Sequence, residues 1–192
     1  EVSTNPVLLD LYFGMQTQHM KFGQLGNVLP SQNPINLAEN IAMVSQMLDG
    51  RVFAGFARGY QPRRVNVIVQ HVGLSDPASG PEYEDLKREL FEEHFDIILK
   101  AWSNDTFRHE GKHWTIPTKD IHWAAADVAH KYGQGVDEND HVVEIGIAPP
   151  THEKQIPDMF MPFATSERSI RWGMERDIVP VTILTDAEVT HS

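Results

Sequence analysis

The sequence predicts an α/β protein with a mainly parallel sheet, and two observations support this. Short apolar runs bounded by glycine or proline alternate with longer amphipathic segments along most of the chain. Alternation of this kind needs crossover connections, which place helices outside a parallel sheet. The predicted order is β-α-β-(loop)-α-(hairpin and loop)-β-α-β, which fits either a doubly wound sheet or a (β/α)8 barrel. Because a full barrel takes about 250 residues, a barrel within these 192 residues is incomplete.

The first half of the chain contains two helical patterns and two strand patterns. Each helical pattern follows an Asn-Pro step, and their apolar spacing predicts helices over 7–15 and 35–48. Residues 19–30 are predicted as a strand interrupted by glycines, which usually mark a bulge or the close approach of another group. A short strand over 51–56 completes this half.

The second half begins with the longest predicted helix, over 83–102. Its apolar residues lie on one face, and acidic residues gather in its early turns, as the helix dipole favours. A Glu-Gly-Lys turn predicts a hairpin over 107–116, and residues 117–150 are polar, histidine-rich and irregular. The remaining predicted elements are a strand over 159–163, a helix capped by Ser166 that runs to Arg176, and a strand over 178–184.

Composition and charge exclude several functional classes. The chain has 27 acidic and 16 basic residues and a net charge of −11, so no nucleic-acid partner is expected. No apolar run approaches the length of about 18 residues that a membrane span requires, so no membrane association is expected. The absence of cysteine excludes disulfides, thiolate metal sites and a cysteine nucleophile. Together with the absence of a signal-peptide pattern, this predicts a cytoplasmic protein.

The sharpest local motif is His109-Glu110-Gly111-Lys112-His113, which matches the zinc-peptidase pattern H-E-x-x-H. That chemistry needs both imidazoles on one face of a helix, with the glutamate as the base. The central glycine and the following Pro117 favour a hairpin with two solvated histidines instead. A zinc-dependent hydrolase that uses His109, Glu110 and His113 is kept as an alternative function, and no residue is assigned as a metal ligand.

Arg58 and Gly59 indicate a different kind of chemistry. The sequence has no Walker A motif, no G-x-G-x-x-G and no G-x-S-x-G. Arg58 instead follows a predicted strand, at the end that faces the active site in parallel α/β proteins. It can pair with a phosphate or carboxylate, and Gly59 lets the backbone approach a ligand. An ion pair with a neighbouring acid explains Arg58 equally well, and His122 and His130 are weaker candidates for substrate contact.

Two early segments carry the most specific patterns. They contain Leu29-Pro30, Asn33-Pro34 and Leu37-Ala38-Glu39, followed by Asp49-Gly50-Arg51, Gly55 and Arg58-Gly59-Tyr60. Together these patterns closely resemble the bacterial luciferase-like, flavin-dependent monooxygenases. The resemblance continues through 91–102, 107–117 and 157–172, so it covers most of the chain.

The resemblance implies a (β/α)8 TIM-barrel fold, incomplete because strands are missing at both ends, with residues 1–192 as a single partial domain. It implies a flavin-dependent monooxygenase that oxygenates a small organic substrate with O2 and reduced FMN, with the deazaflavin F420 as the alternative cofactor. A flavin reductase is the expected partner, and a homodimer is expected to form through residues 36–47 unless that helix packs on its own barrel. An inactive truncated barrel fragment is a further alternative.

The resemblance also assigns flavin contacts. Leu25-Gly26 stands where the family has a bulge with a non-proline cis peptide against the flavin ring. Arg58 stands near the phosphate, and Ser166 begins a helix, where anion binding is favourable and where a plain N-cap is the alternative. Arg88 matches a further phosphate contact, with a solvated helix residue as the favoured alternative. No catalytic residue is assigned, and Ala57 and Phe163 differ from some relatives, so the substrate stays open. The expected cofactor-binding residues are Leu25, Gly26, Ala57, Arg58, Gly59, Ala164, Thr165 and Ser166.

Overall fold

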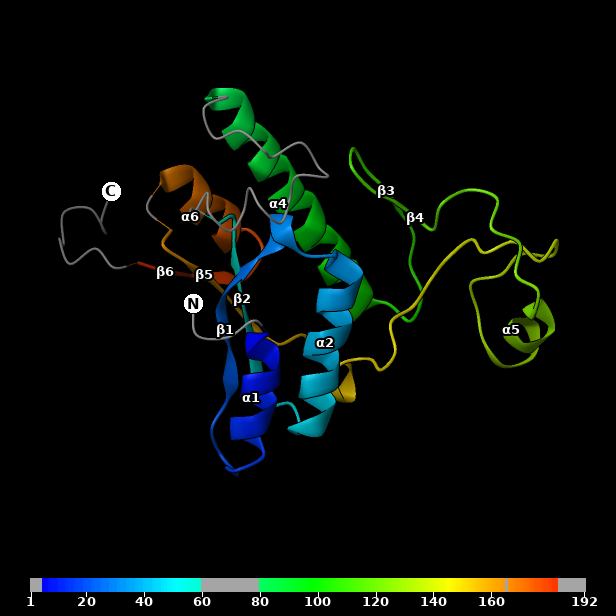
Figure 1. Ribbon diagram of the computed structural model, residues 1–192, viewed down its shortest axis with the longest axis horizontal. Coiled ribbons are helices and arrows are strands. Elements are labelled where there is room, and N and C mark those ends of the chain that lie inside the picture. Colours follow the sequence, from blue (N-terminus) through cyan, green and yellow to red (C-terminus); the bar gives the residue numbers. More distant parts are fainter. Residues whose placement is uncertain (1–4, 60–79, 165, 183–192) are drawn as a thin grey trace.

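Parallel strands form the centre of the computed structural model (Figure 1). The structure describes residues 5–59, 80–164 and 166–182. Within these ranges the larger sheet has four strands in the order β1-β2-β5-β6, and every neighbouring pair is parallel. Their bounds are β1 Phe22–Val28, β2 Val52–Ala57, β5 Asp158–Pro162 and β6 Ile178–Val181.

Helices connect these strands and pack outside the sheet, as the alternation predicts. Asn33 caps α2, because its side chain accepts hydrogen bonds from the backbone N–H groups of Ile35 and Asn36 at 3.0 and 3.1 Å. Ser166 caps α6 in the same way, as predicted. The long helix α4 lies beside α2 (Figure 1). The bounds are α1 Pro6–Gly14, α2 Pro34–Met47, α4 Pro81–Ser103 and α6 Glu167–Met174.

The core lies between the helices and one face of the sheet. Alternate residues of β2, among them Phe56, belong to the same buried cluster as apolar residues of α2 and α4. Phe56 meets the Phe95 ring edge-on at a centroid distance of 5.5 Å, and Phe95 meets Trp172 of α6 at 5.2 Å. On the other face, Phe53 and Phe160 contact each other and are partly exposed. In a (β/α)8 barrel that second face lines the interior.

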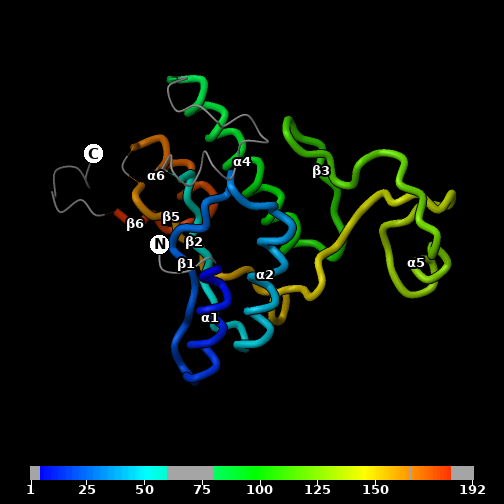
Figure 2. The backbone as a smooth tube through the Cα atoms, viewed as in Figure 1, coloured from blue at the N-terminus to red at the C-terminus, as the bar shows by residue number. Residues whose placement is uncertain are grey.

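Most of the segment 117–150 projects away from the four-stranded sheet, with α5 (Ala126–Tyr132) far from it (Figures 1 and 2), whereas Ile145 and Ile147 pack against the core. This segment is largely irregular, as predicted, but the short helix α5 is not predicted from the sequence. Isolated bridges between Phe107 and Ile145, His122 and His141, and Val136 and Val142 hold it together. Among the described helices, none combines the length and apolarity needed to cross a bilayer.

The remaining differences from the predicted elements are small. The first strand ends at Val28, and residues 29–31 form the 3-10 turn η1 (Leu29–Ser31), because Pro30 has a fixed φ and no N–H to donate to a strand. A second 3-10 turn, η4, covers His152–Lys154. In the predicted last strand, residues 183–184 lie outside the described ranges.

Candidate functional site

A bulge interrupts β1 where the sequence predicts one. Gln24 pairs with Ala54 and Asn27 pairs with Phe56, so Leu25 and Gly26 together oppose the single residue between those partners. Leu25 is 45% exposed there. The bulge therefore presents an apolar side chain near the carboxyl end of the strand.

The peptide bond between Leu25 and Gly26 is trans, so the expected non-proline cis peptide is wrong for this structure. Among the described residues, the cis bonds precede Pro117 and Pro149. The bulge alone changes the register of β1 and β2, because it places one additional residue in β1. The turn of the backbone at this position is thus achieved without cis geometry.

Gly55 allows the bulge to pack against β2. A Cβ atom on Gly55 would lie 2.2 Å from the carbonyl oxygen of Leu25 and 2.4 Å from its carbonyl carbon, and this backbone cannot swing aside. The Asn27 side chain also donates a buried hydrogen bond of 3.0 Å to the Gly55 carbonyl. The bulge is therefore held against the neighbouring strand by backbone contact.

Gly55→Ala is expected to destabilise the protein by about 1–3 kcal/mol, because the new methyl group forces the bulge away from β2. The matched control is Gly26→Ala in the same bulge, where the nearest atom, Cβ of Ala57, would be 4.0 Å away. Urea unfolding followed by circular dichroism measures both. Equal unfolding free energies for the two variants would contradict this account of the packing.

Arg58 and Gly59 follow β2 directly, at the same end of the sheet. Gly59 has φ +80°, a left-handed conformation that favours glycine. The Arg58 side chain is 34% exposed, and Nη1 lies 3.9 Å from Oε2 of Glu84. Burial lowers the pKa of the Arg58 guanidinium and the charge of Arg88 adds to this, but an arginine stays protonated at neutral pH.

Two cations and two carboxylates act on the charge of Arg58. The charges of Arg88 and Arg168 lower its pKa, and those of Glu84 and Glu92 raise it. Arg88 itself lies 3.6 Å from Glu92. The charges of these four neighbours balance, so the positive charge of Arg58 is not cancelled, and in a chain of net charge −11 it is suited to bind an anion. Among the described residues the cluster consists of four cations and two carboxylates: Arg58, Lys87, Arg88, Arg168, Glu84 and Glu92.

The end of β5 contributes the third predicted segment. Ala164 is buried at 3% exposure, whereas Thr165 lies outside the described residues. Ser166 is exposed, accepts a hydrogen bond from the Ser169 N–H at 3.3 Å and donates one to Ser169 Oγ at 2.9 Å.

Apart from Thr165, the structure brings the predicted residues to one edge of the sheet. The strands β1, β2 and β5 are neighbours and parallel, so their carboxyl ends meet there. Ala57 pairs with Val28, just beyond the bulge. The sequence analysis did not identify Glu84, Lys87 or Arg168, because more than 20 positions separate them from Arg58 and no local pattern marks them.

His122 and His130 do not join this edge. The His122 ring lies 5.8 Å from the ring of His141, and His130 Nε2 lies 3.0 Å from the carboxylate of Asp140. Both pairs belong to the projecting segment 117–150, away from the strands (Figure 1). The structure therefore does not place these two histidines beside Arg58.

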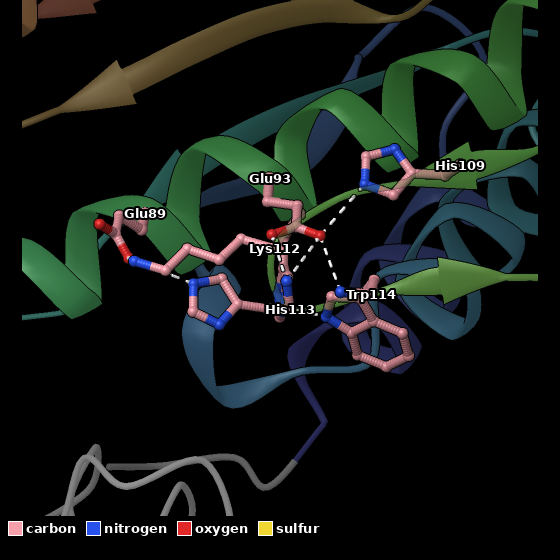
Figure 3. A network of polar contacts seen from close by, with 7 residues as sticks. Glu89, Glu93, His109, Lys112, His113 and Trp114 are labelled. Atoms are coloured by element: carbon pink, nitrogen blue, oxygen red, sulfur yellow. Dashed lines mark hydrogen bonds and ion pairs between the residues drawn. The ribbon is translucent and has the colours of Figure 1, made fainter.

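The H-E-x-x-H motif lies on a hairpin, as its glycine predicts. The strands β3 (His109–Glu110) and β4 (Thr115–Ile116) are antiparallel. Figure 3 shows Glu93 of α4 facing His109, His113 and Trp114, and it accepts hydrogen bonds from the backbone N–H groups of His113 and Trp114 at 2.9 and 2.8 Å. The hairpin is thus fastened to the long helix through a carboxylate.

His109 is buried, so the expectation of two solvated histidines is wrong for this residue. Its Nδ1 lies 3.2 Å from the Lys100 ammonium, which can only donate, so Nδ1 accepts. Nε2 then carries the proton and donates to Glu93 at 3.1 Å. His113 contacts a different carboxylate, Glu89, at 3.3 Å. Within the described ranges no group of three side chains is arranged to hold a metal ion, and no observation favours the zinc hydrolase.

Glu93→Gln is expected to lower the free energy of unfolding at neutral pH by about 1–2 kcal/mol, because the amide replaces a charged acceptor that is only 10% exposed. Partial burial raises the pKa of Glu93, but the hydrogen bonds from His113, His109 and Trp114 outweigh it and hold the pKa below its usual range. Its stabilisation is therefore complete above the unfolded pKa of about 4.3 and is lost as the pH falls through the lower folded value.

Unfolding measured between pH 3 and pH 7 tests this, and Glu89→Gln is the control, since that glutamate also binds the hairpin but is 43% exposed. The loss of wild-type stability below about pH 4.3 should be shallower in Glu93→Gln. A parallel pH profile for wild type and Glu93→Gln would contradict the prediction.

Comparison with known proteins identifies the family. The sequence profile described as luciferase-like monooxygenase matches residues 3–137, which is more than half of the chain. The chain therefore belongs to the luciferase-like monooxygenase family, as the motifs around Arg58 and Gly55 indicate.

Two curated relatives come from Pseudomonas putida. A 3,6-diketocamphane 1,6-monooxygenase is 29% identical over 181 residues, which cover 93% of this chain and 44% of the relative. A 2,5-diketocamphane 1,2-monooxygenase is 24% identical over 184 residues, which cover 92% of this chain and 42% of the relative. The chain thus spans less than half the length of the curated relatives it matches.

Solved structures support the fold. The oxygenating constituent of 3,6-diketocamphane monooxygenase from Pseudomonas putida, a type II Baeyer-Villiger monooxygenase in complex with FMN, superposes with a TM-score of 0.67 at 26% identity, covering 96% of this chain and 44% of that one. The monooxygenase RslO1 from Streptomyces bottropensis has a TM-score of 0.61 at 15% identity, and the match covers 93% of this chain and 43% of RslO1. The predicted fold class, an incomplete (β/α)8 TIM-barrel type, is confirmed.

Proposed function

We propose that this chain is part of an FMN-dependent monooxygenase that oxygenates a small organic substrate. The observation that carries the proposal is the position of Arg58, a half-buried arginine that directly follows β2, beside the β1 bulge at the carboxyl edge of the sheet. Family membership supports the reaction class. Reduced FMN would supply the electrons that activate O2, with one oxygen atom entering the substrate and the other leaving as water.

The residues of this edge fit a flavin with a phosphate tail. Arg58 and Arg88 supply positive charge for the phosphate, and Ser166 adds a hydroxyl at the start of α6. Leu25 and Phe163 expose 45% and 58% of their surface at the same edge, which gives a flat ring system apolar surface to cover. The proposed cofactor contacts are Leu25, Gly26, Ala57, Arg58, Gly59, Ala164, Thr165 and Ser166.

FMN is favoured over the deazaflavin alternative because a structurally similar relative was solved with FMN. Similarity to the diketocamphane monooxygenases makes cyclic ketones the first substrate class to test. A separate flavin reductase is the proposed partner, and the cytoplasm is the proposed location. A homodimer through α2 would use its exposed Met43 and Met47, since the opposite face of α2 already packs on its own core. Residues 1–192 are proposed to form one partial barrel domain.

Flavin retention is the direct test. The purified chain is incubated with excess FMN, desalted, and examined by visible absorption and flavin fluorescence, with circular dichroism to establish that it is folded. We expect a retained flavin spectrum and quenched fluorescence. Samples with retained flavin are then chemically reduced, mixed with O2 and a cyclic ketone, and examined for the oxygenated product by mass spectrometry.

A folded chain that retains no FMN would contradict the proposal that these residues alone form a flavin site. The same measurement with F420 distinguishes the two cofactors, because retention of F420 without FMN would assign the chain to the deazaflavin alternative.

A further inference from the structure

One carboxylate in the cation cluster is explained neither by the predicted cofactor contacts nor by helix capping. Glu84 lies in the first turn of α4. Its Oε1 accepts a hydrogen bond of 2.6 Å from Nζ of Lys87, and its Oε2 lies 3.9 Å from Nη1 of Arg58. One carboxylate therefore faces two cations, one on its own helix and one after β2.

Lys87 holds this carboxylate in place. The Lys87 side chain is only 7% exposed, although lysine is almost never buried without a partner. Its ammonium lies 4.9 Å from the centre of the Tyr83 ring and 2.6 Å from Glu84. Removing Glu84 from Lys87 would leave a buried ammonium without this charged partner, so the carboxylate stays anchored when other groups bind nearby.

The contact between Glu84 and Arg58 is of a different kind. A separation of 3.9 Å is beyond the range of about 2.7–3.2 Å for an N–H···O hydrogen bond, so Glu84 does not engage the guanidinium as a paired acceptor. It instead acts on Arg58 through its charge, which raises the pKa of Arg58 against the effect of burial and of Arg88. Within the ranges that the structure describes, no hydrogen bond occupies the guanidinium N–H groups of Arg58, so they can engage a second anion.

We propose that Glu84 is a built-in counter-ion that competes with a bound phosphate group for the charge of Arg58. The inference rests on the proposed function, in which the flavin phosphate binds at Arg58. Because Lys87 keeps the carboxylate beside the guanidinium, Glu84 repels the phosphate and weakens binding of FMN relative to riboflavin, which has no phosphate. The consequence is a flavin that exchanges readily, as a cofactor reduced on a separate protein requires.

The experiment compares FMN and riboflavin as probes. Dissociation constants for both are measured by fluorescence quenching on the 192-residue chain as wild type, Glu84→Gln and Glu82→Gln. Glu82 is the matched control, because it is exposed and lies in the same first turn of α4. Glutamine at position 84 keeps an oxygen to accept the Lys87 hydrogen bond, and thermal melts establish that all three proteins are equally folded.

We expect Glu84→Gln to bind FMN about two- to fivefold more tightly than wild type, as for the removal of one partly exposed charge. Riboflavin affinity should not change, and Glu82→Gln should match wild type for both flavins. The FMN affinity of Glu84→Gln should also fall more steeply with salt, because the site then carries more positive charge. If the role of Glu84 were purely structural, Glu84→Gln would change the affinities for FMN and riboflavin by the same factor.

Unchanged or weaker FMN binding by Glu84→Gln, in a chain whose wild type prefers FMN to riboflavin, would overturn the inference and leave the proposed function standing. Equally tighter FMN binding by Glu82→Gln would also overturn the inference, since any acidic residue in the first turn of α4 would then weaken FMN binding to the same extent. A chain that binds neither flavin, or binds both equally as wild type and as Glu84→Gln, would overturn the phosphate site at Arg58 and the inference with it.

Discussion

Replacing Phe95 by alanine is expected to lower the free energy of unfolding by about 3–5 kcal/mol. Phe95 has no exposed surface, and its ring meets those of Phe56 and Trp172 at centroid distances of 5.5 and 5.2 Å. It therefore joins α4, β2 and α6 at a single position. Alanine would leave a cavity where these three elements meet, and it could close only if α4 or α6 shifted against the sheet.

Urea unfolding measures this effect, and Tyr132→Ala on α5 is the control, since that aromatic side chain is 76% exposed. The control should change stability by less than about 0.5 kcal/mol. Similar losses for the two variants would mean that the helices do not pack on the sheet through Phe95.

Arg58→Ala is expected to weaken FMN binding about 10- to 100-fold, which corresponds to the loss of hydrogen bonds between charged groups. The guanidinium is half-buried beside other cations, so a bound phosphate would be less well solvated and more strongly held there. Riboflavin affinity should be unaffected, because riboflavin lacks the phosphate. Fluorescence titration with both flavins gives the ratio directly.

The matched control for Arg58 is Arg171→Ala, which removes the same charge from a surface pair with Glu167 on α6, where the Arg171 side chain is 69% exposed. It should bind both flavins as wild type does. A comparable loss of FMN and riboflavin affinity in Arg58→Ala would assign Arg58 to the flavin ring or to the fold, and the phosphate would then bind elsewhere.

The elements of the sheet are predictable because their signals are local. The Asn-Pro step at Asn33 caps α2, Ser166 caps α6, and the glycines of residues 22–28 do mark a bulge. Each of these features depends on residues within one or two turns of each other. The family resemblance added the barrel, which periodicity alone could not separate from a doubly wound sheet.

The parts that sequence reasoning missed depend on contacts between distant residues. Arg58 and Glu84 are 26 positions apart in the sequence, and Glu93 and His109, which are hydrogen-bonded, are 16 positions apart. The sequence analysis attributed the early acids of α4 to the helix dipole, which describes Glu82 and Glu84 equally well. It also treated His109 as solvated, because nothing near the hairpin in sequence shows that a buried carboxylate lies beneath it.

Most of the segment 117–150 lies within a longer loop whose two ends, at Phe107 and Ile145, are paired. Phe107 and Ile145 exchange backbone hydrogen bonds of 2.8 and 3.0 Å, and Thr106 donates to Glu144 at 2.6 Å, so the base of the projection is closed. Once a loop is closed at its base, doubling its length costs only about 0.6 kcal/mol of chain entropy. Insertions and deletions in this segment should therefore be nearly neutral for the barrel, which makes it the part of the chain that evolution can most freely lengthen, shorten or exchange.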